Sequence, residues 1–314
     1  TWSYEPGSIA KALTFAAVFE SGVWGEFMEV PVHSVLEYRL DDDKVHRFRT
    51  EQVRAEGGVE HWLPVRILRE SSNTGTIALV EHLGADGLHQ TLSDFGLGQP
   101  TALQLHGEAS GILDELDSNV IELQSASIGQ GIAATPLQML MAYNALATGG
   151  LLMDPALVIE DGNREVRRVV SSATADTVVR MMERVVSDGT GKRAAVVGYD
   201  VAGKTGTAWQ VCDNGYLCED GSRHITASFA GIVSNDNGAA LSAIVVVDGL
   251  HLDGQGGGSV AAPVFADLAA YSLQQMRVPN TSDAVRPEGR VRAEPAAPQV
   301  PEWAAADEVG ADED

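Results

Sequence analysis

The 314-residue sequence predicts an α+β fold, in which a layer of helices packs on an antiparallel sheet. Three observations support this class. Segments of helical character occupy much of the chain up to Gly189, and the pattern changes at about residue 197 to strand-like segments. A last helical segment starts near Pro263. Since 44% of the residues are hydrophobic, the chain can bury a sizeable core.

Ordinary start and stop signals delimit the helical segments. In "ATPLQMLMAYNALATGG", Thr135 is expected as the N-cap, Pro136 as the first helical residue and Gln138 as the capping-box partner, and Gly149 follows the end. The segment "SIAKALTFAAVFESG" is expected as a helix with Ser8 near its N-terminus. The other expected helices are "SSNTGTIALVEHLG", the shorter "LHQTLSDFGLG", "SATADTVVRMMERVVSDGTG" and "AAPVFADLAAYSLQQM".

The strand-like segments are expected to form an antiparallel meander. They are "YDVAGKTGTAWQV", "ITASFAGIVS" and "AALSAIVVVD". Asn237-Gly238 separates the last two and is a strong signal for a hairpin turn. The polar stretch 41–65 is expected to be loop with short strands. The sequence therefore indicates an antiparallel sheet flanked by helices.

A change of composition after about residue 278 indicates two regions. Residues 1–278 are expected to form one folded domain. Residues 279–314 are rich in proline, alanine and acidic residues, which is typical of a disordered tail. The chain begins without a starting methionine or a signal-like leader, so we expect further residues upstream.

The formal charge of −23 excludes some classes of partner. Such a surface repels phosphate backbones and anionic lipid, so we expect no nucleic-acid partner. No run approaches 18 apolar residues, so we expect no membrane-spanning segment within this sequence.

Cysteines and histidines indicate no metal site. Cys212 and Cys218 could close a small disulfide loop in an oxidising compartment, or stay reduced. A C-x-x-C pair is absent, and the eight histidines show no ligand spacing, so we expect them to be surface or structural residues.

Three short motifs follow one another in the chain: "SIAK" at 8–11, "SSN" at 71–73 and "KTGT" at 204–207. A serine hydroxyl becomes a nucleophile when a neighbouring base takes its proton. Ser8 and Lys11 are three residues apart and lie on one helix face. Lys11 can act as that base only when it is neutral, so its pKa must be lowered by burial and by a second cation, Lys204.

The second motif fits between the two lysines. The Ser71 hydroxyl would link Lys11 to Lys204 as a relay and return a proton to the leaving amine. The amide of Asn73 can bind both sides of a substrate peptide bond. Helix capping would explain either residue type equally well on its own.

The third motif is suited to a substrate carboxylate. Lys204 supplies a cation, Thr205 and Thr207 supply hydroxyls, and Gly206 lets a substrate approach the strand backbone closely. The backbone N–H groups of Ser8 and Thr207 could form an oxyanion hole. Taken alone, Lys204 could be an edge-strand charge and Ser8 an N-cap. The conjunction of the three motifs favours catalysis.

These motifs belong to a wider resemblance. S-x-x-K, S-x-N and K-T-G together are typical of penicillin-binding proteins and serine β-lactamases. Over about residues 4–276 the chain resembles the transpeptidase domain of a class B penicillin-binding protein, nearest the division type. The landmarks are "YEPGSIAKALT", "SSNTGT", "FGLGQPTALQLHGEASG", "SIGQGIAATPLQMLMAYNALATGG", "GTGKRAAVVGYDVAGKTGTA" and "GGSVAAPVFADLAAY".

The resemblance implies a peptidoglycan D,D-transpeptidase. It implies an acyl ester on Ser8, with Lys11 as base, Ser71 and Asn73 as the second motif and residues 204–207 as the third. Stem peptides ending in D-Ala-D-Ala and β-lactams would be the ligands, and no cofactor or metal is implied.

The resemblance also implies a setting. In this family a membrane anchor, a pedestal domain and further strands and a helix of the catalytic domain precede the nucleophile, whereas seven residues do so here. The expected location is the outer face of the bacterial cytoplasmic membrane. A glycan-strand polymerase and division proteins are the expected partners, through the preceding part.

Two alternatives stay open on sequence. A serine β-lactamase or D,D-carboxypeptidase of the same superfamily would hydrolyse the acyl-enzyme, although no "E-x-x-L-N" supplies a deacylating glutamate. A non-catalytic β-lactam sensor or division scaffold would keep the fold without turnover. The insertion holding Cys212 and Cys218 would either shape access of the acceptor or be a plain hairpin loop.

Overall fold

A three-stranded antiparallel sheet carries the third motif. The computed structural model describes residues 2–39, 44–101, 103, 106–116, 120–157, 166–212, 215–218, 220–251 and 255–281. Strands β7 (Asp200–Trp209), β8 (His224–Asn235) and β9 (Gly238–His251) follow in the order β7-β8-β9. The Asn237-Gly238 turn joins β8 to β9, as the sequence predicted. Within the described residues β7 forms one edge of this sheet.

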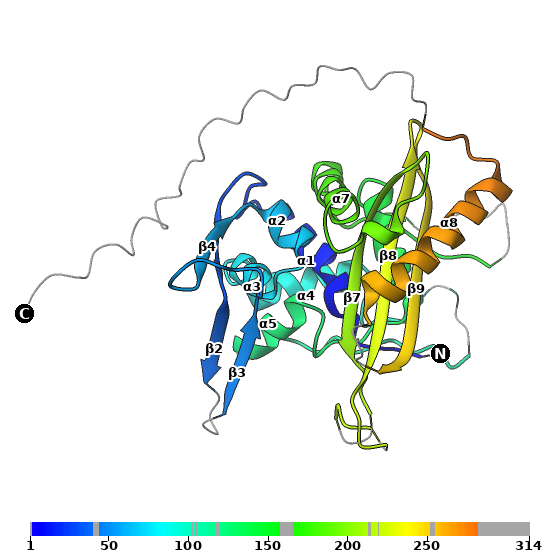
Figure 1. The fold of residues 1–314 in the computed structure, drawn as a ribbon. Helices are drawn as coiled ribbons and strands as arrows, with labels where there is room; N and C mark the ends of the chain where they lie inside the picture. Colours follow the sequence, from blue (N-terminus) through cyan, green and yellow to red (C-terminus); the bar gives the residue numbers. More distant parts are fainter. Residues whose placement is uncertain are drawn as a thin grey trace, which may run out of the picture.

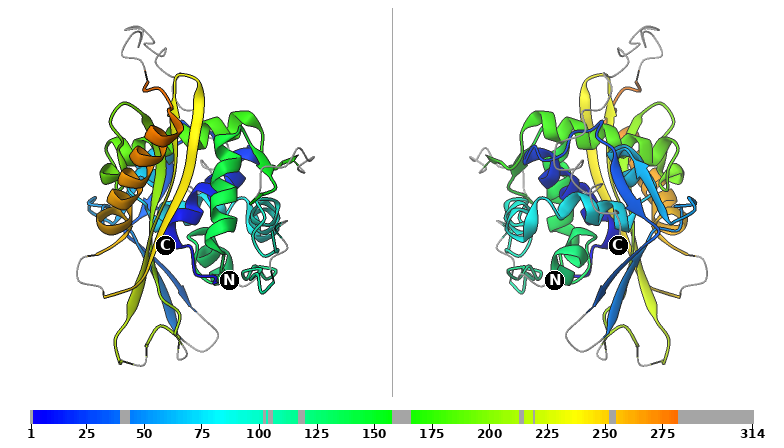
Figure 2. Two further views of the ribbon diagram at one scale, coloured as in Figure 1. Left: turned by 90° about the vertical axis from the view of Figure 1, so that its right-hand side faces the viewer. Right: turned by 90° about the vertical axis from the view of Figure 1, so that its left-hand side faces the viewer.

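Helices cover both faces of the sheet. Helix α8 (Ala262–Met276) lies on one face and the remaining helices lie on the other (Figure 2). Side chains of β8 alternate between the two cores: Phe229 packs against Phe265 of α8, with ring centroids 4.7 Å apart. Ala230 and Ile232 join the larger core on the helical side. Every residue of β8 from Ile225 to Val233 is buried, so the strand is covered on both faces.

The helical layer is built around α1 (Lys11–Glu20), which is buried from Lys11 to Val18. A helix that is apolar on all sides must lie inside the core. The other helices of this layer are α2 (Pro64–Arg69), α3 (Asn73–Val80), α4 (Gly84–Asp94), α5 (Val120–Ser127), α6 (Pro136–Ala147) and α7 (Ser172–Ser187) (Figure 1). The predicted capping box at Thr135 and Gln138 opens α6.

Three small strand pairs lie outside the main sheet. They are β1 (Val30–His33) with β4 (Val59–Trp62), β2 (Val35–Arg39) with β3 (Val45–Arg49), and β5 (Leu151–Met153) with β6 (Val166–Arg168). The polar stretch 41–65 thus contains the short strands β3 and β4 that were expected there, whereas β1, β2, β5, β6, α2 and α5 were not expected. The whole arrangement confirms the predicted α+β class.

Backbone contacts with the sheet region continue past residue 278, the expected end of the domain. The Asn235 side chain donates to the carbonyl of Pro279, and the N–H of Thr281 donates to the carbonyl of Gly198. The rest of the expected tail, 282–314, lies outside the described residues. None of the described helices combines the length and the apolar character needed to cross a bilayer.

Candidate active site

Ser8 lies in a short 3-10 turn (Gly7–Ala10) that precedes α1. Gly7 adopts a φ of 54°, a region that favours glycine, and its N–H donates to the carbonyl of Gly129 at 2.9 Å. A Cβ on Gly129 would lie 2.1 Å from the Gly7 oxygen. Two glycines distant in sequence therefore fix the turn that holds Ser8, which is itself half-buried.

Lys11, one helical turn after Ser8, is completely buried. Its Nζ lies 2.7 Å from the carbonyl oxygen of Ser71, 2.6 Å from Oδ1 of Asn73 and 3.3 Å from Oγ of Ser71. Burial, and next the charge of Lys204, hold the pKa of Lys11 well below its usual range. In the neutral amine two hydrogens serve the two shorter contacts, which leaves the lone pair free to accept a proton.

Lys204 approaches the same hydroxyl from the sheet. It is fully buried on β7, and its Nζ donates to Oγ of Ser71 at 2.8 Å and to the carbonyl of Thr205 at 3.1 Å. Burial lowers its pKa to about 7. Within the described residues the hydrogen-bond partners of both lysines are uncharged oxygen atoms. The Ser71 oxygen thus connects two buried amines whose pKa values are both lowered.

Ser71 is held in a strained conformation. Its φ of 59° lies in the left-handed region, which costs a non-glycine residue about 1–2 kcal/mol. The turn between α2 and α3 enforces it, because the Ser71 N–H donates to the carbonyl of Leu68 and the next residue, Ser72, caps α3 by accepting from the N–H of Gly75. The surrounding fold thus maintains the left-handed backbone of Ser71, and in this conformation the Ser71 hydroxyl lies between the two lysines.

The side chains that follow Lys204 on β7 have partners that the sequence analysis did not single out. Oγ1 of Thr205 lies 2.9 Å from Oγ1 of Thr190, which stands between α7 and β7. The exposed Thr207 accepts from the N–H of Gly257, just before α8. Thr190 lies in "GTGK" and Gly257 in "GGS", and both segments belong to the family landmarks. Their place in these landmarks is the sequence signal that could have identified the two residues.

Packing gives a second reason for the glycine at 206, besides the close approach of a substrate that was expected. A Cβ there would lie 2.2 Å from Oγ of Ser228 and 3.0 Å from the side chain of Ile9. Packing of β7 against β8 and against the turn that carries Ser8 therefore already excludes a side chain, irrespective of any substrate.

Most of the predicted site residues are brought together. Hydrogen bonds link Lys11, Ser71, Asn73 and Lys204 into one cluster, and Thr205 contacts Lys204. Ser8 lies on the turn before Lys11, although no hydrogen bond of its hydroxyl occurs within the described residues. Catalytic contacts of this kind are often loose without substrate. The oxyanion-hole roles of the Ser8 and Thr207 N–H groups stay predictions.

Comparison with known proteins agrees with this geometry. A family model described as the penicillin binding protein transpeptidase domain matches residues 1–270. The chain belongs to this family. Its relatives identify it as a transpeptidase domain of the class B penicillin-binding proteins.

Two relatives and one solved structure illustrate the similarity. Stage V sporulation protein D of Bacillus subtilis is 34% identical over 292 residues, which cover 88% of this chain and 43% of that protein. Peptidoglycan D,D-transpeptidase FtsI of Escherichia coli K12 is 30% identical over 278 residues, covering 88% of this chain and 44% of that protein. Penicillin-binding protein 3 of Mycobacterium tuberculosis, complexed with ampicillin, has a TM-score of 0.74 at 32% identity, covering 91% of this chain and 65% of that one. The chain spans under half the length of both curated relatives.

In this penicillin-binding protein domain a disulfide hairpin stands beside the site. Cys212 and Cys218, between β7 and β8, are joined by a disulfide. Tyr216 of the hairpin donates to the carboxylate of Glu5 at 3.0 Å, and Glu5 also accepts from the N–H of Gly131. A cavity of about 400 Å³ is lined by residues 2–5, 131–133 and 209–211. The hairpin thus contacts the segment that leads into Ser8.

Proposed function

We propose that this domain is a peptidoglycan D,D-transpeptidase that forms an acyl ester on Ser8. The observation that carries the proposal is the Ser71 hydroxyl shared by Lys11 and Lys204, both of them buried. A buried, neutral lysine next to a serine is an activated nucleophile–base pair. A second amine, near its own pKa at neutral pH, is suited to a substrate carboxylate.

The proposed reaction has two acyl transfers. Ser8 Oγ attacks the carbonyl carbon of the penultimate D-Ala while Lys11 Nζ takes the hydroxyl proton. The C–N bond then breaks, and the leaving D-Ala receives a proton through Ser71. In the second transfer an amine of another stem peptide attacks the ester and releases Ser8. Asn73 keeps its amide NH₂ available for a substrate carbonyl, because its Oδ1 is occupied by Lys11.

The proposal includes a ligand class and a setting. β-Lactams would acylate Ser8 in place of the stem peptide, as the ampicillin complex of the Mycobacterium tuberculosis relative supports. We place the domain at the outer face of the cytoplasmic membrane, held by an anchor outside this sequence. A glycan-strand polymerase and division proteins are the proposed partners.

Intact-mass spectrometry of the protein with benzylpenicillin tests the proposal. We expect an adduct of one drug molecule that persists for hours in the wild type and is absent in Ser8→Ala. We expect the long lifetime because a transpeptidase transfers its acyl group to an amine, and hydrolysis of the ester by water is slow.

Two other results would each contradict the proposal. A transient adduct accompanied by drug turnover would identify a β-lactamase or carboxypeptidase. A folded protein, by circular dichroism, that forms no adduct would identify a scaffold.

A further inference from the structure

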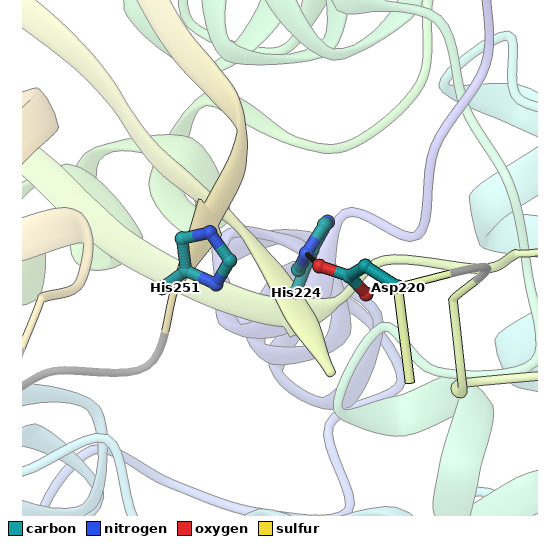
Figure 3. Close-up of side chains that lie close together, drawn as sticks. All are labelled: Asp220, His224 and His251. Carbon is teal, nitrogen blue, oxygen red and sulfur yellow. Dashed lines mark hydrogen bonds and ion pairs between the residues drawn. The ribbon is translucent and has the colours of Figure 1, made fainter. Parts of the chain in front are cut away.

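A cluster of two histidines and one aspartate lies at the end of the main sheet that carries the disulfide hairpin. His224 is the first residue of β8, His251 is the last residue of β9, and Asp220 lies in the connection between β7 and β8. The strand register pairs His224 directly with His251. Figure 3 shows the three side chains, with His224 between the other two.

The distances within this cluster suit a shared ligand. Nε2 of His224 lies 2.9 Å from a carboxylate oxygen of Asp220, and the two imidazole rings have centroids 4.7 Å apart. One potential ligand atom from each residue lies within 4.8 Å of the other two. Around a tetrahedral zinc ion, with Zn–N distances of about 2.0–2.1 Å, ligand atoms are about 3.3 Å apart. Small side-chain rotations therefore close the site.

The carboxylate is already oriented for such a ligand. The backbone N–H and the hydroxyl of Ser222 donate to Oδ1 of Asp220 at 3.0 and 2.8 Å. The other oxygen, Oδ2, faces His224. Supporting hydrogen bonds of this kind are typical of metal-ligating carboxylates.

We propose that Asp220, His224 and His251 bind one divalent transition-metal ion of the zinc type, with water completing a tetrahedron. The two imidazole nitrogens favour Zn²⁺ over Mg²⁺ or Ca²⁺, and a carboxylate oxygen is also a common zinc ligand. The ion takes the place of the hydrogen bond between Nε2 of His224 and Asp220. The sequence showed no ligand spacing because the two histidines meet only through the register of β8 and β9.

The bound ion fastens the hairpin to the sheet near the candidate active site. His224 is three residues before Ala227, which pairs with Thr207 of the third motif. Three strand residues span about 10 Å. The hairpin also reaches Glu5, three residues before Ser8. Metal binding therefore restrains a loop that contacts both segments of the site.

Isothermal titration of the metal-free, untagged protein with Zn²⁺ alone tests the proposal. We expect one saturable site per chain in the wild type. His224→Gln and His251→Gln each lower its affinity by tenfold or more. His61→Gln, an exposed histidine on β4, serves as the matched control and leaves the affinity unchanged. Circular dichroism checks that all variants fold.

Absorption of Co²⁺ added in place of Zn²⁺ gives a second readout. A tetrahedral site produces ligand-field bands in the wild type and in His61→Gln, and these bands disappear in His251→Gln. The proposal is overturned by Zn²⁺ binding that is equally strong in all variants, which would identify scattered acidic groups. It is equally overturned if the folded wild type binds no Zn²⁺, which would leave only the hydrogen bond between Asp220 and His224.

Discussion

At the scale of single residues, two lysines of the candidate site are buried, and their burial lowers the stability of the fold. Lys11 and Lys204 have no measurable exposure, and neither has a carboxylate among its hydrogen-bond partners in the described chain. Burying an ammonium group without a counter-ion is costly, so both pKa values fall. The apolar α1 and the sheet beside it supply the burial that makes a neutral lysine available.

This burial predicts a pH-dependent stability. Between pH 7 and the ordinary lysine pKa of 10.5, the unfolded chain holds a proton on Lys204 that the folded chain does not. The contribution of Lys204 to the free energy of unfolding therefore rises with pH in this window and is lost as pH falls through about 7. Lys204→Met removes that contribution. We expect urea unfolding to show a smaller gain in stability from pH 7 to pH 9 than in the wild type.

The same variant should lose acylation by benzylpenicillin, although it folds. At pH 7 it should be at least as stable as the wild type, because an apolar side chain replaces a buried amine that is costly to charge. Lys11 contributes to the pH dependence with the same sign, so the dependence weakens without vanishing. An unchanged slope between pH 7 and pH 9 would show that Lys204 is not the buried group that titrates.

At the scale of elements, the turn that carries Ser8 depends on a glycine from another segment. Gly129 adopts a φ of 79°, and a Cβ there would overlap the carbonyl of Gly7. Gly131, two residues later, has a similar φ of 71°, but a Cβ there would meet only the Cβ of Ser125 at 3.9 Å. A substitution by alanine would therefore strain the backbone at both positions, but only at Gly129 would the new Cβ also clash with another segment.

This pair of glycines predicts a matched comparison. Gly131→Ala should cost about 1 kcal/mol, from the left-handed backbone alone. Gly129→Ala should cost at least about 2–3 kcal/mol, because the Gly7 carbonyl must also move. It should in addition slow acylation of Ser8. Urea unfolding and the rate of benzylpenicillin adduct formation measure both effects, and equal costs would mean that the turn before α1 adapts freely.

Elements with local causes could be predicted from the sequence, and those with distant causes could not. The capping box of α6 and the Asn237-Gly238 turn are set by neighbouring residues and occur where expected. Strand β1 was missed because it exists through its pairing with β4, in which Val30 faces Trp62. Its own four residues carry no distinguishing pattern.

The same distinction holds for the candidate site. The motifs predicted which residues take part, because residue type and order are written in the sequence. They did not predict the left-handed backbone of Ser71 or the contact of Asn73 with Lys11, which depend on how α2 ends against α3. The cross-strand meeting of His224 and His251 was missed for the same reason.

At the scale of the whole molecule, the core of the described residues can be followed to its C-terminal end. Its last buried hydrophobic residue is Leu273, and contacts of the backbone continue to Thr281. We propose that the domain ends there and that the following residues add charge without stabilising it. Removal of residues 282–314 should leave the melting temperature and the benzylpenicillin acylation rate unchanged. A lower melting temperature would assign part of the core to that region.

Because Lys11 and Lys204 share the Ser71 oxygen, the pKa of Lys11 depends on what is bound at Lys204. The charge of Lys204 is one of the two causes that keep the pKa of Lys11 low. A carboxylate bound at Lys204 would cancel that charge and raise the pKa of Lys11 toward its usual range. Under the proposed function, the proton affinity of Lys11 therefore depends on whether a substrate carboxylate lies at the third motif.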